Sequence, residues 1–117
     1  MRELAGFVRE LAGRPEVDAV VLASPDGLPI DQAGPAELDA EELAALAATA
    51  ARGAAQLAAA AGRGGVRTAV IESDRGLVVL AGAGSKGGLL VLTRSGANIG
   101  ELLFDLRRRR PALTALL

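Results

Sequence analysis

The stretch "VDAVVLASPDGLPIDQ", residues 17–32, decides the fold, because it predicts a strand, a tight turn and a returning strand. The run "AVVLA", residues 19–23, is short and continuously apolar, which is typical of a buried strand. In "SPDG", Pro25 presets the backbone for a turn and Gly27 permits a positive φ. Pro29 has no N–H to donate to a neighbouring strand, so the returning strand "LPID" is expected at a sheet edge.

Helices are predicted on both sides of this hairpin. Residues 3–12, "ELAGFVRELA", place four apolar side chains at the spacing of one helical face. These are Leu4, Phe7, Val8 and Leu11. The longest helix is expected over residues 40–61, because Asp39 is a favoured N-cap residue and Glu42 completes the capping-box spacing. Gly62 is expected to end this helix.

Three strand-like runs follow at close spacing. They are "RTAVIES" (67–73), "GLVVLAG" (76–82) and "GLLVLTR" (88–94). Parallel neighbours need long crossovers, so these short connections predict antiparallel hairpins. A last helix is expected within residues 95–117, interrupted by Pro111. The predicted order is therefore α-β-β-α-β-β-β-α, which is an α+β fold.

The glycine-rich stretch "AGAGSKGG", residues 81–88, suggests a nucleotide site at first sight. Gly82, Gly84 and Gly87 fit the dinucleotide fingerprint, and Lys86 lies among them. That fingerprint requires a strand before the glycines and a helix after them, so that the pyrophosphate meets the helix N-terminus. Here the glycines lead into the strand-like run "GLLVLT", and the frame of the Walker pattern is also wrong. We therefore predict a loop between two strands, and no cofactor.

Composition narrows the function further. A chain of 117 residues is expected to form one domain, residues 1–117. It has no cysteine and no histidine, which argues against thiol or Ser-His-Asp catalysis and against histidine metal sites. The net charge of −1 and only two aromatic residues, Phe7 and Phe104, argue against nucleic-acid binding. We expect a cytoplasmic protein without a membrane span, and not an enzyme.

The long helix presents two contrasting faces on a helical wheel. One stripe is expected to lie on the sheet, and its members are Leu43, Leu46, Ala50, Ala54, Leu57 and Ala61. The opposite face carries Ala45, Ala48, Arg52, Ala55 and Ala59, flanked by Thr49, Gln56, Ala44 and Ala51. After the first turn Arg52 is the only charged residue, whereas a solvated helix of this length normally shows several. Two interpretations stay open: packing on a twin or a partner, or simply the helix propensity of alanine.

Taken in order, four segments resemble the Roadblock domain family, of the dynein light-chain and gliding-motility regulator type. They are "VDAVVLASPDGLPI" (17–30), the helix end "AAAAGRGG" (58–65), "VRTAVIESDRGLVVL" (66–80) and "LLVLTRSGANIGELLFDLRR" (89–108). The resemblance implies a five-stranded antiparallel sheet in the order 2-1-5-4-3, with the long helix on one face and the terminal helices on the other. It also implies homo- or heterodimers formed through the long helix and the third strand, and binding to small Ras-like GTPases. Some relatives accelerate GTP hydrolysis, and others are scaffolds or dynein light chains.

The resemblance and the charge-poor helix face together give a candidate dimer or partner interface. It comprises Ala45, Ala48, Thr49, Arg52, Ala55, Gln56 and Ala59 on the long helix, with Arg67, Ala69 and Ile71 on the third strand. That strand contains no proline and ends the sheet opposite Pro29. An open edge of this kind invites pairing with another chain.

Arginines are the remaining candidates. The run Arg107, Arg108, Arg109 and Arg110 suits the C-terminal end of a helix, or provides candidate contacts to an acidic partner. An arginine inserted into a GTPase site is a further option, for which exposure suggests Arg52, Arg63, Arg67 or Arg75. Three functions remain open: a homodimeric GTPase regulator, a scaffold without effect on hydrolysis, and a ligand-sensing domain that uses the core groove.

Overall fold

The computed structural model describes residues 2–82 and 87–117, and it has the predicted order of helices and strands. The elements are α1 (Arg2–Ala12), β1 (Val17–Ala23), β2 (Pro29–Ala33), α2 (Ala40–Ala60), β3 (Thr68–Ser73), β4 (Gly76–Gly82), β5 (Gly88–Thr93) and α3 (Gly100–Leu116).

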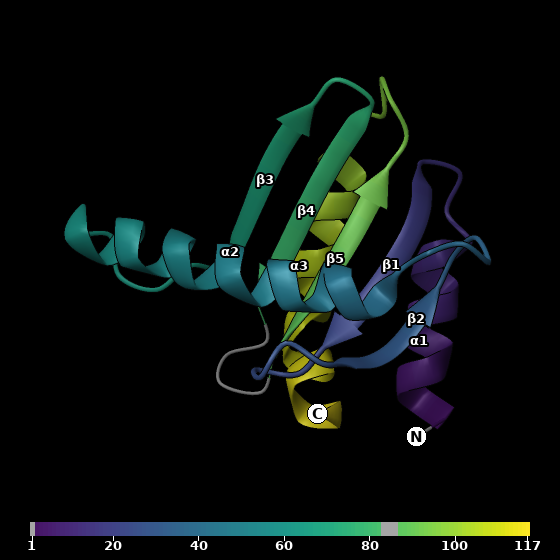
Figure 1. The fold of residues 1–117 in the computed structure, drawn as a ribbon, viewed down its shortest axis with the longest axis horizontal. Coiled ribbons are helices and arrows are strands. Elements are labelled where there is room, and N and C mark those ends of the chain that lie inside the picture. Colours follow the sequence, from purple (N-terminus) through teal and green to yellow (C-terminus); the bar gives the residue numbers. More distant parts are fainter. Residues whose placement is uncertain (1, 83–86) are drawn as a thin grey trace.

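All strands form one antiparallel sheet in the order β2-β1-β5-β4-β3, which confirms the predicted topology. In Figure 1, α2 crosses in front of the sheet, and α1 and α3 lie behind it. β2, which begins at Pro29, is one edge, and β3 is the other. The molecule therefore has three layers: α2, the sheet, and the pair of terminal helices α1 and α3.

The first hairpin forms as its sequence predicts. Gly27 has a φ of 83°, and its N–H donates to the Ser24 carbonyl at 3.0 Å. A methyl group on Gly27 would lie 3.3 Å from the Cβ of Ala48. The turn is thus tucked against α2, and glycine satisfies both the positive φ and this close approach.

The glycine-rich stretch joins two neighbouring strands, as predicted. Gly82 at the end of β4 pairs with Gly88 at the start of β5. Gly87 has a φ of 126°, and a Cβ there would lie 2.2 Å from the Ala23 carbonyl oxygen, so only glycine fits. Gly84 and Lys86 lie outside the described residues.

The main hydrophobic core lies between the sheet and the terminal helices. The four α1 residues predicted to share a face are all buried there, against strand residues such as Val20, Leu22 and Val91. The prediction that Pro111 interrupts the last helix is wrong, because α3 continues to Leu116. Proline removes one helical hydrogen bond, but Leu113, two residues later, is buried in the core and fixes the last turns.

The long helix α2 begins as predicted and faces the sheet differently. The carboxylate of Asp39 accepts a hydrogen bond from the Glu42 N–H at 3.1 Å. The predicted sheet-facing stripe is only partly correct: Leu43 packs against the cluster on this side of the sheet, but Leu46 and Leu57 are 59% and 72% exposed. The side against the sheet is centred on Ala44, which was expected to flank the opposite face and lies roughly a quarter turn from the stripe at about 100° per residue. Leucines are the largest apolar residues on the helical wheel, so they were expected to face the sheet. The helix instead packs on the sheet mainly through alanines.

By length and average hydropathy alone, α2 also meets the criterion for a membrane-spanning helix, with a mean hydropathy of 1.2. That result differs from the expectation of no span. In this fold the first turns of α2 pack on the sheet, where Ala40 and Ala44 are 5% and 0% exposed. The rest of α2 is alanine-rich and mostly exposed.

Candidate functional site

The β3 edge of the sheet is incompletely covered on both faces. Val70 pairs with Val79, and Ile71 pairs with Val78, so the two side chains point to opposite sides of the sheet. They are 44% and 45% exposed. Thus neither the α2 layer nor the α1–α3 layer fully covers β3 within the part of the chain that the structure describes.

The second half of α2 extends beyond this same edge. In Figure 1 the helix crosses β3 and projects past it before the chain returns to begin β3. Two leucines on its outer side, Leu46 and Leu57, are exposed. They are eleven residues apart, which is close to three helical turns, so they share a face. We use the name β3-edge surface for four exposed residues taken together: Leu46 and Leu57 on α2, and Val70 and Ile71 on the two faces of β3.

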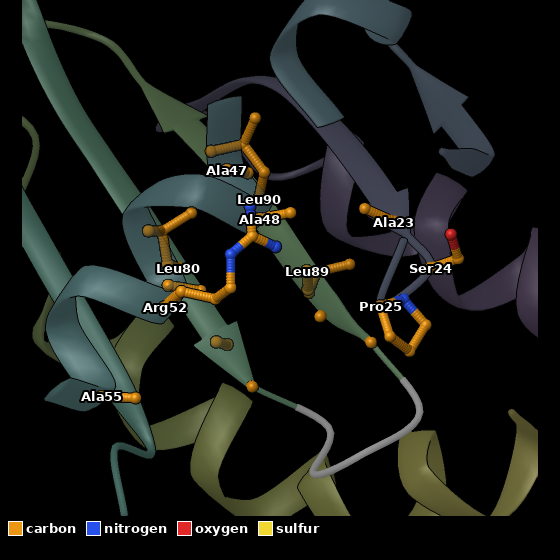
Figure 2. A pocket seen from close by; sticks show the side chains of 15 residues that line it. Ala23, Ser24, Pro25, Ala47, Ala48, Arg52, Ala55, Leu80, Leu89 and Leu90 are labelled. Atoms are coloured by element: carbon orange, nitrogen blue, oxygen red, sulfur yellow. The ribbon is translucent and has the colours of Figure 1, made fainter. Parts of the chain in front are cut away.

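A hollow of about 290 Å³ lies between α2 and the sheet. Figure 2 shows it lined by small and apolar side chains from α2, β4 and β5, with Ser24 and Pro25 at the hairpin turn. Arg52 is the one charged side chain in its described lining. Its Nη2 donates to the Thr49 hydroxyl at 3.3 Å, which holds the guanidinium group back along the helix. The hollow is therefore an apolar space with a cation at its border.

An ion-pair cluster joins the two terminal helices on the opposite side of the molecule. The Asp105 carboxylate accepts from Arg108 at 2.6 Å, from Arg109 at 3.2 Å and from Arg14 at 3.3 Å. Arg109 also pairs with Glu10, and its guanidinium carbon lies 5.6 Å from the centre of the Phe7 ring. Arg108 and Arg109 therefore serve contacts within this chain, and Arg107 and Arg110 point elsewhere.

The arginines change the acidity of their partners. Burial alone raises the pKa of Asp105, but the hydrogen bonds and charges of Arg108 and Arg109 outweigh burial and hold that pKa below its ordinary value. The hydrogen bond and charge of Arg109 likewise lower the pKa of Glu10. Both carboxylates stay ionised at neutral pH and favour the α1–α3 contact.

Comparison with known proteins decides the family. Residues 6–93 match the profile of the Roadblock/LC7 domain. The chain belongs to the Roadblock/LC7 domain family. Two uncharacterized proteins of Methanocaldococcus jannaschii, MJ0310 and MJ1340, are each 32% identical to this Roadblock domain over 91 residues, 78% of this chain and 79% of theirs.

Solved structures agree with this fold. A Roadblock/LC7 domain from Streptomyces avermitilis is similar with a TM-score of 0.80 at 29% identity, over 93% of this chain and 96% of that one. Myxococcus xanthus MglB is similar with a TM-score of 0.88 at 20% identity, over 97% of this chain and 94% of its own. The MglB likeness shows a shared fold.

The predicted interface residues of this Roadblock domain fall into separate places. Ala45, Thr49, Gln56 and Ala59 are exposed on α2, and Ile71 belongs to the β3-edge surface. Ala48, Arg52 and Ala55 instead line the hollow beneath α2. Ala69 is half-buried, and Arg67 lies at a cleft beside α3.

Sequence reasoning missed Leu46, Leu57 and Val70 as exposed residues. The eleven-residue spacing of Leu46 and Leu57 correctly predicted that they share a helical face. The spacing alone does not determine whether that face packs on the sheet. Among the described residues, no cluster of three or more carboxylate, histidine or cysteine side chains could hold a metal ion.

Proposed function

We propose that this chain is a dimeric, non-enzymatic regulator that binds a small Ras-like GTPase. The observation that carries the proposal is the β3-edge surface, where one sheet edge and one helix both extend beyond their own core. Exposed apolar side chains beside an open strand edge mark an interaction site.

The geometry favours a second copy of the chain as the first partner. Pairing of β3 with the β3 of a twin would continue the sheet, and the projecting half of each α2 would then lie over the twin. Ile71 is on the α2 side of the sheet, so the twin's helix would cover it. Fully burying a leucine or isoleucine stabilises by about 1.5–3 kcal/mol, so burial of Ile71 and of Leu57 in the projecting half of α2 would contribute to a dimer's stability.

The GTPase partner is supported by family membership. Family resemblance implies Ras-like GTPases as partners, and MglB shares the fold. The absence of cysteine and histidine from the sequence favours a regulator that acts by binding. It would change hydrolysis by ordering the GTPase's own loops or by supplying an arginine to the phosphates.

The deciding experiment is single-turnover GTP hydrolysis by a candidate Ras-like GTPase, with and without this protein, with binding followed in parallel. Faster hydrolysis supports the regulator and justifies substituting Arg52, Arg63, Arg67 and Arg75 in turn. Binding without a change in rate identifies a scaffold. The protein has no Trp or Tyr, so its concentration is best measured by refractive index.

Two variants separate dimerisation from GTPase binding. Ile71→Arg places a charge on the β3-edge surface and is expected to give a monomer by sedimentation. Leu28→Arg is the matched control, because Leu28 is 63% exposed before β2 at the other edge of the sheet. An Ile71→Arg protein that remains dimeric would contradict the proposed interface.

A further inference from the structure

A second cleft opens on the opposite side of the sheet from the hollow under α2. It lies between α3 and the adjoining ends of β3, β4 and β5, and its volume is about 490 Å³. Its floor consists of buried apolar side chains, each at most 9% exposed: Phe7, Leu89, Leu106 and Leu113. Three arginines border it: Arg67, Arg107 and Arg110. The cleft thus combines an apolar interior with a strongly cationic border.

The three arginines are not neutralised by the chain itself. The described lining contains no carboxylate, and no ion pair joins any of the three to a carboxylate among the described residues. Their neighbours in sequence behave differently, since Arg108 and Arg109 are both paired with Asp105. Within the four-arginine run, Arg108 and Arg109 therefore belong to the contact between α3 and α1. Arg107 and Arg110 border the cleft, where no carboxylate of the described lining balances their positive charge.

Tertiary structure brings these arginines together from separate parts of the chain. Arg107 and Arg110 are one helical turn apart on α3, and Arg67 immediately precedes β3. Arg110 is half-buried, and its Nη2 lies 3.9 Å from where a Cβ on Gly82 would be. Like charges gathered in one place repel each other, so an anion between them would be favourable.

We propose that this cleft binds a phosphate monoester that carries an apolar substituent. The planar guanidinium group matches phosphate oxygens in a two-point contact, and Thr68 in the lining carries a hydroxyl, which is a second type of donor. A phosphate dianion balances more of the three charges than a single carboxylate does. The apolar floor gives a place for the substituent, and the volume is in the range of small-molecule sites, roughly 300–1,000 Å³.

The proposal does not depend on the GTPase function, because the arginines substituted in its test, Arg107 and Arg110 on α3, are not among those substituted in the hydrolysis test. Its test is titration calorimetry with hexyl phosphate on the purified full chain. Arg107→Ala and Arg110→Ala are each expected to weaken binding by about tenfold or more, since each removes a charged hydrogen-bond donor. Arg110→Lys keeps the charge without the two-point geometry, so it should fall between the wild type and Arg110→Ala.

The matched control is Arg94→Ala, which removes the same charge at the far end of β5, outside the cleft. It should bind hexyl phosphate as the wild type does. Hexanol should not bind, because it lacks the phosphate group. Inorganic phosphate should bind more weakly than hexyl phosphate, because it lacks the apolar chain. Thermal unfolding of each variant verifies that it is folded.

Several outcomes would overturn the proposal. These are no binding of hexyl phosphate by the wild type at millimolar concentration, or equal weakening by Arg94→Ala and Arg110→Ala. Binding of a polyglutamate peptide in place of hexyl phosphate would assign the cleft to an acidic protein segment instead. If hexyl phosphate binds, competition by vesicles containing phosphatidic acid identifies a lipid headgroup as the source, and no competition identifies a soluble ligand.

Discussion

The two faces of the sheet are built from different side chains, and an open space borders each of them. On the α1–α3 face, branched and aromatic side chains such as Phe7, Val8 and Leu102 fill a core with Leu22 and Val79 of the sheet. On the α2 face, the helix contributes mainly alanines, with a hollow beside them and leucines turned outward.

This difference separates α1 and α3, whose large apolar side chains are mostly buried, from α2, whose leucines Leu46 and Leu57 are exposed. A face packed with large side chains gains most of its hydrophobic stabilisation within one chain. An alanine face gains less from burial, but it permits close approach and leaves larger apolar groups exposed.

The largest effect is expected from Leu102→Ala on the α1–α3 face. Leu102 is 0% exposed, so the substitution leaves a cavity and should lower the free energy of unfolding by about 2–5 kcal/mol. Urea denaturation followed by far-UV circular dichroism measures it. A loss below about 1 kcal/mol would mean that this face is not the completed core.

A smaller effect is expected from the charged contact beside that core. Asp105→Asn should lower the free energy of unfolding at pH 7 by about 1–3 kcal/mol, since Arg14, Arg108 and Arg109 lose their carboxylate. The folded pKa of Asp105 is lowered, so its contribution is complete above the ordinary carboxylate pKa and is lost as pH falls through the folded value.

The same variant therefore gives a pH signature. Wild-type stability should decline as the solution becomes more acidic than about pH 4, and Asp105→Asn should show a shallower decline there. Denaturant titrations at several pH values measure this difference. Identical pH dependence in both proteins would show that Asp105 is not the linked group.

On the α2 face, the N-cap is expected to matter more than the outer leucines. Asp39→Ala removes the acceptor of the Glu42 N–H and should lower the free energy of unfolding by about 1 kcal/mol. Asp39→Asn retains an acceptor and is the matched control. If both variants lose the same stability, the charge and not the cap would be responsible.

The smallest effect on unfolding is expected from Leu57→Ala. At concentrations where the protein is monomeric, the change should be within about 0.5 kcal/mol, because the side chain is 72% exposed. The same substitution should weaken self-association in analytical ultracentrifugation. A large loss of monomer stability would break the comparison, since it would show that Leu57 already belongs to a core.

Much of the fold followed from local chemistry. The "SPDG" turn, the Asp39 cap and the spacing of Leu4, Phe7, Val8 and Leu11 all gave correct elements, because each depends on residues close in sequence. The family resemblance supplied the strand order, which the structure confirms. The break expected at Pro111 does not occur, because the burial of Leu113 outweighs the local cost of a proline inside the helix.

The candidate surfaces were harder to foresee. A helical wheel correctly grouped Leu46 with Leu57, but the orientation of α2 depends on which of its faces fits the sheet. The run of four arginines was visible in the sequence. Which of them form ion pairs within the chain depended on where Asp105 and Glu10 lie in the fold. Neither outcome is encoded within a few neighbouring residues.

The sequence by itself determined the order of the elements, the turn, the helix cap and the family of this Roadblock domain, because backbone preference and hydrophobic period act over short distances. Only the tertiary structure decided that α2 meets the sheet through alanines and that Arg67 joins Arg107 and Arg110 at one cleft. The reason is physical: these arrangements arise from packing between segments distant in the chain, where shape and total burial choose among faces that look equally apolar or equally charged.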